Sequence, residues 1–315
     1  MRSKPALALA VCVSLLTVCE VAAQDLGPNV RKIKDGIYVY VGNPRNSTDA
    51  ARDSNAGIVI TQEGVVLIDS GNNPTDSRAI LDAVKKLTSK PVRYLILTEP
   101  HVDHYTGCVL FSPPAVVIVS EPPIESMKSR EPDDPARIQT MMTASPEMRA
   151  ALEGYRFVVP QLEYRQKMTL NVGERTFELL YLKNVHSEAD TAIWLPKERV
   201  LFSAAGIVRD QFNILRSFVT IPDILAASKM LKGLNPEFVI PGHGVPGTVK
   251  IFEDTEQYYA LLLDRVGKMV KDGKSLDQIK KELHMPEYDH WGSKDRIPTN
   301  IEAAYKVVKP SYAFR

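Results

Sequence analysis

The sequence predicts an α/β fold in which layers of helices cover two packed β-sheets. Two observations support this fold class. Short apolar runs of strand length are interleaved with segments whose apolar residues recur at helical spacing, and this order occurs in two similar halves. No linker-like stretch separates the halves. We therefore expect a single domain over residues 24–315, with helices at its C-terminal end.

The first half is expected to consist mainly of strands. Lys32–Gly42 alternates apolar and polar residues, which is typical of a half-buried strand. The apolar runs 57–60 and 64–68 flank a short polar turn and predict a hairpin. A helix is expected at 75–87, because its apolar residues share one face. The remaining elements expected here are strands at 94–97 and 115–119 and a helix around 136–152.

The second half repeats the pattern and adds helices toward the C-terminus. Apolar runs of strand length again precede segments of helical periodicity, so each half is expected to supply one sheet. Strands are expected at 167–171, 175–182, 191–195, 199–203 and 237–241, and helices at 222–234, 248–272, 275–283 and 299–308.

The composition is that of an ordinary globular protein. Among 315 residues, 44% are apolar and 24% are charged. The 17 glycines and 22 prolines are an ordinary number for this length, which excludes the collagen-like, low-complexity and disordered classes. The 39 basic and 38 acidic side chains nearly cancel, so the chain lacks the basic excess of a dedicated nucleic-acid binder. We expect a small-molecule substrate as its partner and no nucleic acid; the sequence does not indicate an oligomeric state.

Residues 1–23 have the pattern of a secretory signal peptide. Arg2 and Lys4 supply a positive start, Ala6–Val18 is apolar except at Ser14 and Thr17, and Ala23 is a small residue suited to cleavage. The apolar run is shorter than a typical membrane span. We expect an exported protein, periplasmic or secreted, without membrane attachment after cleavage. The alternative interpretation is a core helix or a membrane anchor.

Cleavage would also remove two of the three cysteines, Cys12 and Cys19. Cys108 would remain alone, so no disulfide is expected within the mature chain.

Four of the six histidines lie in three short segments that follow expected strands: 98–104, 185–191 and 240–244. Loops at strand ends are where a rigid scaffold presents reactive groups. Histidine grouped with aspartate and glutamate matches the ligands of divalent transition metals, zinc in particular. A structural role for each histidine is the alternative, which the repetition in three segments disfavours.

At these residues the sequence resembles the metallo-β-lactamase-fold superfamily, from about Asn55 to His243. The central H-x-H-x-D-H motif of that family corresponds here to Glu99-x-His101-x-Asp103-His104. Other matching features are Asp69 at the end of Val-Val-Leu-Ile-Asp, His186 with Asp190, Leu201-Phe202-Ser203, and Pro241-Gly242-His243-Gly244. The resemblance implies a four-layer αββα sandwich and metal-dependent hydrolysis.

The resemblance also implies a role for each matching residue. The first metal site would consist of Glu99, His101 and His186, and the second of Asp103, His104 and His243. Asp103 would in addition act as the catalytic residue that orients the attacking water. Asp69 is expected to accept a hydrogen bond from a ligand histidine, and Asp190 to act similarly; a helix or turn cap is the alternative for both.

Two departures from the family pattern affect this assignment. Glu99 replaces the first histidine of the motif, and Ala205 stands where the family often has an aspartate that bridges both metals. The two replacements cancel in formal charge, so we interpret Glu99 as a compensating ligand. The alternatives are one occupied metal site or an inactive remnant.

Two zinc ions per chain are expected, with one ion as the alternative. Such ions would share a water molecule and lower its pKa from ~15.7 toward ~7. We therefore expect a zinc-dependent hydrolase acting on an ester, lactone, amide (including β-lactam) or thioester bond. The alternative is a single-metal or inactive periplasmic accessory or binding protein. Iron-based redox chemistry is disfavoured, because the relatives that use it keep the bridging aspartate.

Several other residues are weaker candidates. Arg209, Phe212 and Arg216 would line a substrate pocket or belong to an ordinary surface loop. His290 beside Trp291 is more typical of packing than of a site. Ser203 lacks the G-x-S-x-G setting of a nucleophile.

Overall fold

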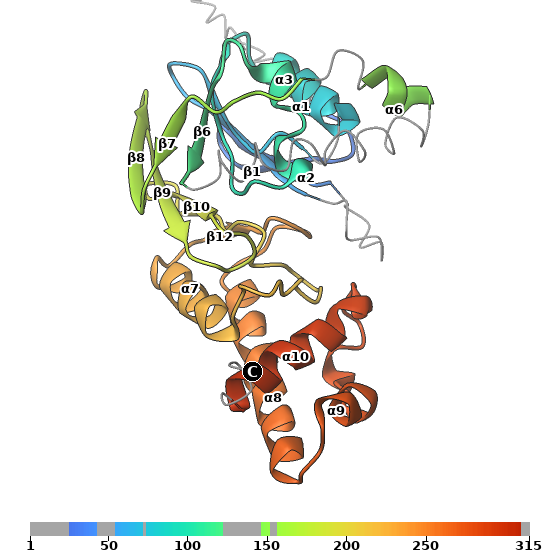
Figure 1. Ribbon diagram of the computed structural model, residues 1–315. Helices are drawn as coiled ribbons and strands as arrows, with labels where there is room; N and C mark the ends of the chain where they lie inside the picture. The colour runs from blue at the N-terminus through green and yellow to red at the C-terminus, as the bar shows by residue number, and fades with distance from the viewer. Residues whose placement is uncertain (1–24, 43–53, 72–73, 122–145, 152–155, 310–315) are drawn as a thin grey trace, which may run out of the picture.

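The computed structural model describes residues 25–42, 54–71, 74–121, 146–151 and 156–309 (Figure 1). The predicted signal peptide, 1–23, lies outside these residues. So do 136–145 and 152 of the expected helix around 136–152, whose described part is the helix α6 (Pro146–Ala151).

The first half forms a mixed seven-stranded sheet in which the strands follow sequence order. The first four strands pair antiparallel and the last four pair parallel, so β4 belongs to both parts. The strands are β1 (Val30–Lys34), β2 (Ile37–Tyr40), β3 (Ala56–Ile60), β4 (Val65–Ile68), β5 (Val92–Ile96), β6 (Val116–Ser120) and β7 (Leu162–Tyr164).

The second half forms a mixed five-stranded sheet of order β12-β11-β10-β9-β8. Only the pair β11 and β12 is parallel; the other pairs are antiparallel. The strands are β8 (Lys167–Val172), β9 (Arg175–Leu182), β10 (Asp190–Leu195), β11 (Val200–Phe202) and β12 (Phe238–Ile240).

The two sheets pack face to face because their central strands are apolar on both sides. In β4, Val66 and Ile68 enter the core between the sheets, whereas Val65 and Leu67 enter the core on the outer face. This division follows from the two-residue repeat of a strand. At Gly57 of β3 the sheets approach closely, since an added Cβ would lie 2.5 Å from the ring of Phe202 on β11.

Helices cover the outer faces and complete four layers, which confirms the predicted αββα sandwich (Figure 1). The outer face of the first sheet packs against α1 (Pro74–Leu87) and α3 (Cys108–Phe111). The core on the outer face of the second sheet includes α7 (Ile221–Gly233) and α8 (Lys250–Lys271), and α10 (Ile297–Val308) packs against α8. The remaining helices are α2 (Val102–Tyr105), α9 (Leu276–Glu282) and two 3₁₀ turns, Pro286–Tyr288 and Lys294–Arg296.

One predicted element is wrong. The expected strand 32–42 is a hairpin of β1 and β2, with the turn at Gly36 in the left-handed region at φ 70°. The apolar alternation runs on through this turn, so periodicity alone does not reveal it. The short β7, α2 and α3 were not predicted. None of the helices in the described residues combines the length and apolarity needed to span a membrane.

Candidate metal centre

The candidate ligands come together at one end of the two sheets, although they lie far apart in sequence. Glu99, His101 and His104 follow β5, His186 precedes β10, and His243 follows β12. Two backbone hydrogen bonds join the sheets at this end. Thr191 N donates to Thr98 O at 2.7 Å, and Asn55 N donates to Gly242 O at 2.8 Å.

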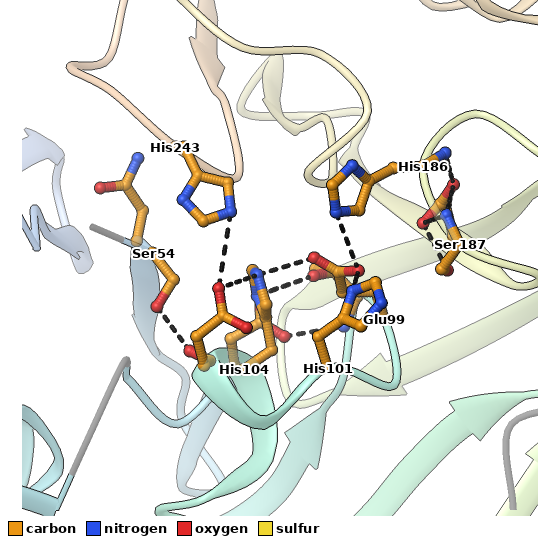
Figure 2. A network of polar contacts seen from close by, with 12 residues as sticks. Ser54, Glu99, His101, His104, His186, Ser187 and His243 are labelled. Atoms are coloured by element: carbon orange, nitrogen blue, oxygen red, sulfur yellow. Dashed lines mark hydrogen bonds and ion pairs between the residues drawn. The ribbon is translucent and has the colours of Figure 1, made fainter. Parts of the chain in front are cut away.

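The histidines form two pairs, each with rings in edge-to-face contact. The ring centroids of His101 and His186 are 5.2 Å apart, and those of His104 and His243 are 5.4 Å apart. Figure 2 shows the four imidazoles turned toward one central space. The two pairs correspond to the two metal sites that the resemblance implies.

Glu99 lies between the two pairs and belongs to both. Its ligand atoms group within 4.8 Å with those of His101 and His186, and also with those of His104 and His243. The carboxylate contacts His101 Nδ1 through Oε2 and lies 2.8 Å from His104 Nε2 through Oε1. The sequence placed Glu99 in the first site only, so its double position is a finding of the structure.

Asp103 lies beside the second pair, but the group of ligand atoms around His104 and His243 contains Glu99 and not Asp103, which was the carboxylate predicted for this site. Its Oδ2 is 3.7 Å from His104 Nε2 and 3.8 Å from His243 Nε2. It also lines the cavity described below, so one side of its carboxylate faces the space in which a substrate would bind.

The contacts of Asp69 determine which nitrogen of His104 carries hydrogen. The Asp69 carboxylate accepts hydrogen bonds from Thr98 N and Thr98 Oγ1, both at 2.7 Å, and lies 2.8 Å from His104 Nδ1. Because an ionised carboxylate only accepts, Nδ1 of His104 is the donor. Asp69 therefore has the predicted position of an acceptor for a ligand histidine. It sits at φ 60°, an uncommon backbone conformation for aspartate.

This hydrogen bond leaves two lone-pair atoms facing each other in the interior. Glu99 Oε1 and His104 Nε2 are buried, lie 2.8 Å apart and make no hydrogen bond of acceptable geometry. Two buried acceptors at this distance require either a proton on Nε2 or a cation bound to both atoms. A divalent metal ion meets that requirement, and these donor types suit zinc.

The electrostatics of the centre favour the ligand forms at Glu99 and His186. Burial opposes ionisation of Glu99, but its interactions with the imidazoles around it, His101 foremost and the protonated His104 among them, hold its pKa well below the usual value. Burial, helped by the charge of Arg216, lowers the pKa of His186 to about 3. An ionised carboxylate and a neutral imidazole are the forms that bind metal.

His104 differs from His186 in this respect. Burial lowers the pKa of its imidazole, but the charges of Glu99, Asp69 and Asp103 outweigh burial and raise the pKa well above the usual value. Without a metal, His104 and Glu99 therefore form a buried ion pair. A proton and a metal ion therefore compete for the same two atoms.

Asp190 contacts the backbone near His186 rather than its ring. It accepts hydrogen bonds from His186 N at 2.6 Å, Ser187 N at 3.0 Å and Ser187 Oγ at 2.6 Å. Burial and the charge of Glu99 raise the pKa of Asp190 to about 7, while these donors lower it. Asp190 is thus in the turn-capping position that the sequence left as the alternative.

A cavity of about 240 Å³ opens onto the centre. Its lining residues come from both halves of the chain and include apolar and basic side chains as well as candidate ligands. They are His101, Asp103, His186, Ala205, Val208, Asn213, Ile214, Arg216, His243 and Arg296. Ala205 therefore faces the site without supplying a carboxylate.

The weaker sequence candidates differ in whether they line the cavity. Arg216 lines the cavity, whereas Phe212 is buried in the core beneath it. Arg209 supports a loop by donating to Pro246 O at 2.6 Å. His290 is exposed, and Trp291 packs among aromatic side chains. Sequence reasoning missed Arg296, because nothing in the polar run Lys294–Arg296 distinguishes it from a surface charge.

The comparison with known proteins agrees with this architecture. The sequence profile described as the metallo-beta-lactamase superfamily matches residues 50–243, which is more than half of the chain. The chain belongs to this superfamily. It therefore combines the fold of the superfamily with a candidate His/Glu metal site in which Glu99 and Ala205 replace two residues of the usual pattern.

Individual relatives are distant. The chain is 24% identical over 252 residues to a beta-lactamase-like protein 2 homolog of Caenorhabditis elegans, covering 79% of this chain and 75% of the relative. It is 23% identical over 263 residues to a metallo-beta-lactamase type 2 of Bacillus cereus, covering 76% and 93%. These identities show common ancestry but not a common substrate.

Among solved structures, the sec-alkylsulfatase Pisa1 from Pseudomonas sp. superposes with a TM-score of 0.65 at 18% identity. The match covers 89% of this chain but only 50% of the alkylsulfatase, so the chain spans half the length of that protein. The likeness supports the fold alone.

Proposed function

We propose that this protein is a zinc-dependent hydrolase of small molecules. The observation that carries the proposal is the buried contact of Glu99 Oε1 with His104 Nε2, at 2.8 Å within a ring of histidines, where a metal ion would take the place of the shared proton. The fold and family support hydrolysis as the reaction class, and the cavity beside the pair supplies space for a substrate.

The residues that would hold zinc fall into the two groups around Glu99. His101 and His186 would serve one ion and His104 and His243 the other, with one Glu99 oxygen directed to each group. When bound, the ions would polarise the substrate and promote ionisation of water at neutral pH. Glu99 would thus supply the shared negative charge that Ala205 does not.

The protein's own side chains would prepare the remaining steps. Asp103 borders the cavity and accepts hydrogen bonds only, so it would orient a water molecule toward the substrate and receive its proton. Asp69 would keep the His104 ring in one orientation through Nδ1. Asp190 would do the same for the loop that carries His186.

We propose an ester, lactone, amide (including β-lactam) or thioester bond as the target. The names of relatives include a metallo-beta-lactamase and an alkylsulfatase, so they support hydrolysis without selecting one bond. A second candidate is a periplasmic binding or accessory protein without turnover. It is favoured by the same facing pair, since a proton on His104 Nε2 also satisfies both atoms.

Metal analysis of the purified protein tests the proposal. We expect about two zinc ions per chain, measured by mass spectrometry of the digested protein, and hydrolysis that a chelator abolishes. Absence of bound metal, with no hydrolysis of lactam, lactone, ester or thioester probes after zinc is added, would favour the binding protein.

Glu99→Gln tests the shared ligand. The substitution keeps the size of the side chain but removes its charge, so both groups should bind zinc more weakly and the variant should retain less than about one equivalent. Glu163→Gln, at an exposed position of β7, is the matched control. Retention of one full equivalent would restrict Glu99 to one site, and unchanged binding would reject it as a ligand.

We also propose that the protein is exported, because residues 1–23 have the pattern of a signal peptide. N-terminal sequencing of the protein from a bacterial host should then begin at Gln24 in the periplasmic or secreted fraction. Intact protein that begins at Met1 and stays in the cytoplasm would contradict this.

A further inference from the structure

Two arginines from separate segments line the cavity at the candidate metal centre. Arg216 lies in the loop between β11 and α7, and Arg296 immediately precedes α10. They are 80 positions apart in the sequence, yet both face the space that also contains His101, His186 and His243. Neither arginine belongs to the groups of candidate metal ligands.

Backbone contacts hold both guanidinium groups in place. Arg216 Nη1 donates to His186 O at 3.0 Å, and Arg296 Nη1 donates to Phe212 O at 3.1 Å. The two segments are also tied together, because Asn300 Nδ2 donates to Asn213 O and to Arg296 O, both at 2.9 Å. The positive charges are therefore positioned before a ligand arrives, which lowers the cost of binding.

The position of Arg216 brings positive charge directly to the candidate ligands. Its Nη1 donates to His186 Nε2 at 3.1 Å, the atom that is 3.6 Å from Glu99 Oε2. A zinc ion bound at Nε2 would replace this contact and leave Arg216 held by His186 O. Arginine stays protonated at any working pH, so this charge persists when metal ions are also bound. A cavity with two guanidinium groups beside a divalent-metal site is strongly attractive to an anion.

We propose that Arg216 and Arg296 bind an anionic oxygen group of the substrate. The planar fork of a guanidinium matches a carboxylate, sulfate or phosphate, each of which offers two oxygen acceptors. The remaining wall at Val208 and Ile214 is apolar and suits a hydrocarbon portion. The substrate class is therefore a small anion in which the hydrolysable bond lies a few atoms from the charged group. This inference rests on the proposed hydrolase function.

A matched pair of aryl esters tests the proposal. Phenyl hydrogen glutarate carries a free carboxylate, and methyl phenyl glutarate carries the same chain with that carboxylate blocked. The zinc-loaded protein should hydrolyse the charged ester with at least about tenfold higher kcat/KM. In Arg296→Gln the ratio of the two kcat/KM values, charged ester over blocked ester, should fall by about tenfold or more. Arg296→Lys should restore part of this ratio. Equal kcat/KM for the two esters would overturn the proposal.

Arg199→Gln is the matched control. Arg199 is exposed and also donates to a backbone carbonyl, Asn235 O, but it lies outside the cavity lining. In Arg199→Gln, the ratio of kcat/KM for the charged ester to kcat/KM for the blocked ester should equal that of the unaltered protein. Zinc content is measured in every variant, because a change at Arg216 could act through His186. An Arg216→Gln variant with full zinc content and an unchanged ratio would exclude Arg216 from anion binding.

Calorimetry separates failure of this inference from failure of the proposed function. Zinc-loaded protein is titrated with glutarate, phenyl sulfate, phenyl phosphate and the neutral analogue glutaramide. If neither ester is hydrolysed but an anion binds and Arg296→Gln weakens it by about tenfold, the anion site stands and hydrolysis does not. The anion with the largest dependence on Arg296 identifies the group. Anion binding that is the same in Arg296→Gln would overturn the inference.

Discussion

The two halves of the molecule hold their candidate ligands in different ways. The first half supplies Glu99, His101, Asp103 and His104 from one stretch that follows β5. The second half supplies His186 and His243 from two loops on different strands. Four donors are thus positioned by one loop and the short α2, and the other two depend on the packing of separate segments.

The means of orientation differ in the same way. His104 is held through its ring, by the Asp69 carboxylate 2.8 Å from Nδ1. His186 and His243 lie on loops whose backbone is held instead. Asp190 accepts from the backbone N–H of His186, and Asn55 Nδ2 donates to Pro241 O at 2.8 Å and Gly244 O at 2.7 Å.

The comparison indicates that the first half is preorganised by buried charge and the second by loop shape. Buried charges are costly to disturb, whereas a loop can adjust when one hydrogen bond is lost. Substitutions in the first half should therefore affect stability and metal binding together, and those in the second half should have smaller and more local effects.

Asp69→Ala should show the largest effect. It leaves Thr98 N, Thr98 Oγ1 and His104 Nδ1 without their acceptor in the interior. We expect a loss of about 3–5 kcal/mol in the free energy of unfolding, measured by urea denaturation, and about 10–100-fold weaker zinc binding. Asp82→Ala, on the surface of α1, is the control. A loss below about 1 kcal/mol would remove the distinction between the halves.

Removal of zinc should loosen the second half more than the first. A ligand present at 100 times its Kd stabilises the folded state by about 2.7 kcal/mol, so chelation should lower the Tm by several degrees. Hydrogen exchange should then increase most in the loops at 183–189 and 241–247. Equal increases at 97–104 would show that both halves depend on metal to the same extent.

Asn55→Ala should have an intermediate effect. The substitution leaves two carbonyl oxygens near His243 without their donor, which costs about 1–3 kcal/mol by urea denaturation. Zinc added to this variant should bind more weakly at the group of His104 and His243 than at the group of His101 and His186. Asn55→Asp should be at least as harmful, because a carboxylate cannot donate to these oxygens. Wild-type stability in both variants would contradict the proposed role of Asn55.

Asp190→Asn should have the smallest effect of the series. An amide oxygen can still accept from the N–H groups of His186 and Ser187, so about 1 kcal/mol of stability should be lost. Zinc binding should weaken by less than in Asp69→Ala. If the two variants weaken zinc binding equally, Asp190 orients His186 as strongly as Asp69 orients His104.

Much of the fold was accessible from the sequence because its signals are local. The run Val65–Ile68 is apolar at every position, and the structure buries it between two cores. The strand expected at 32–42 failed because a turn at Gly36 interrupts the chain without interrupting the apolar alternation. The strand β7 was missed because it has three residues, two of them exposed.

The sequence predicted the candidate site to a similar degree. The stretch 99–104 and the histidines at 186 and 243 are recognisable from residue type and order along the chain. The turn-capping contacts of Asp190 depend on backbone geometry, so the sequence left two interpretations open. Arg296 carried no signal, since its neighbours are ordinary surface residues and its place on the cavity wall comes from the packing of α10.

By itself, the sequence determined the kinds of donor atoms and the strand ends on which they lie, because strand periodicity and residue type are local properties. Only the tertiary structure decided that one glutamate faces both histidine pairs and that two distant arginines share a wall with them. The directions of these side chains follow from how two sheets and a C-terminal helix pack, and packing joins residues that no spacing along the chain relates.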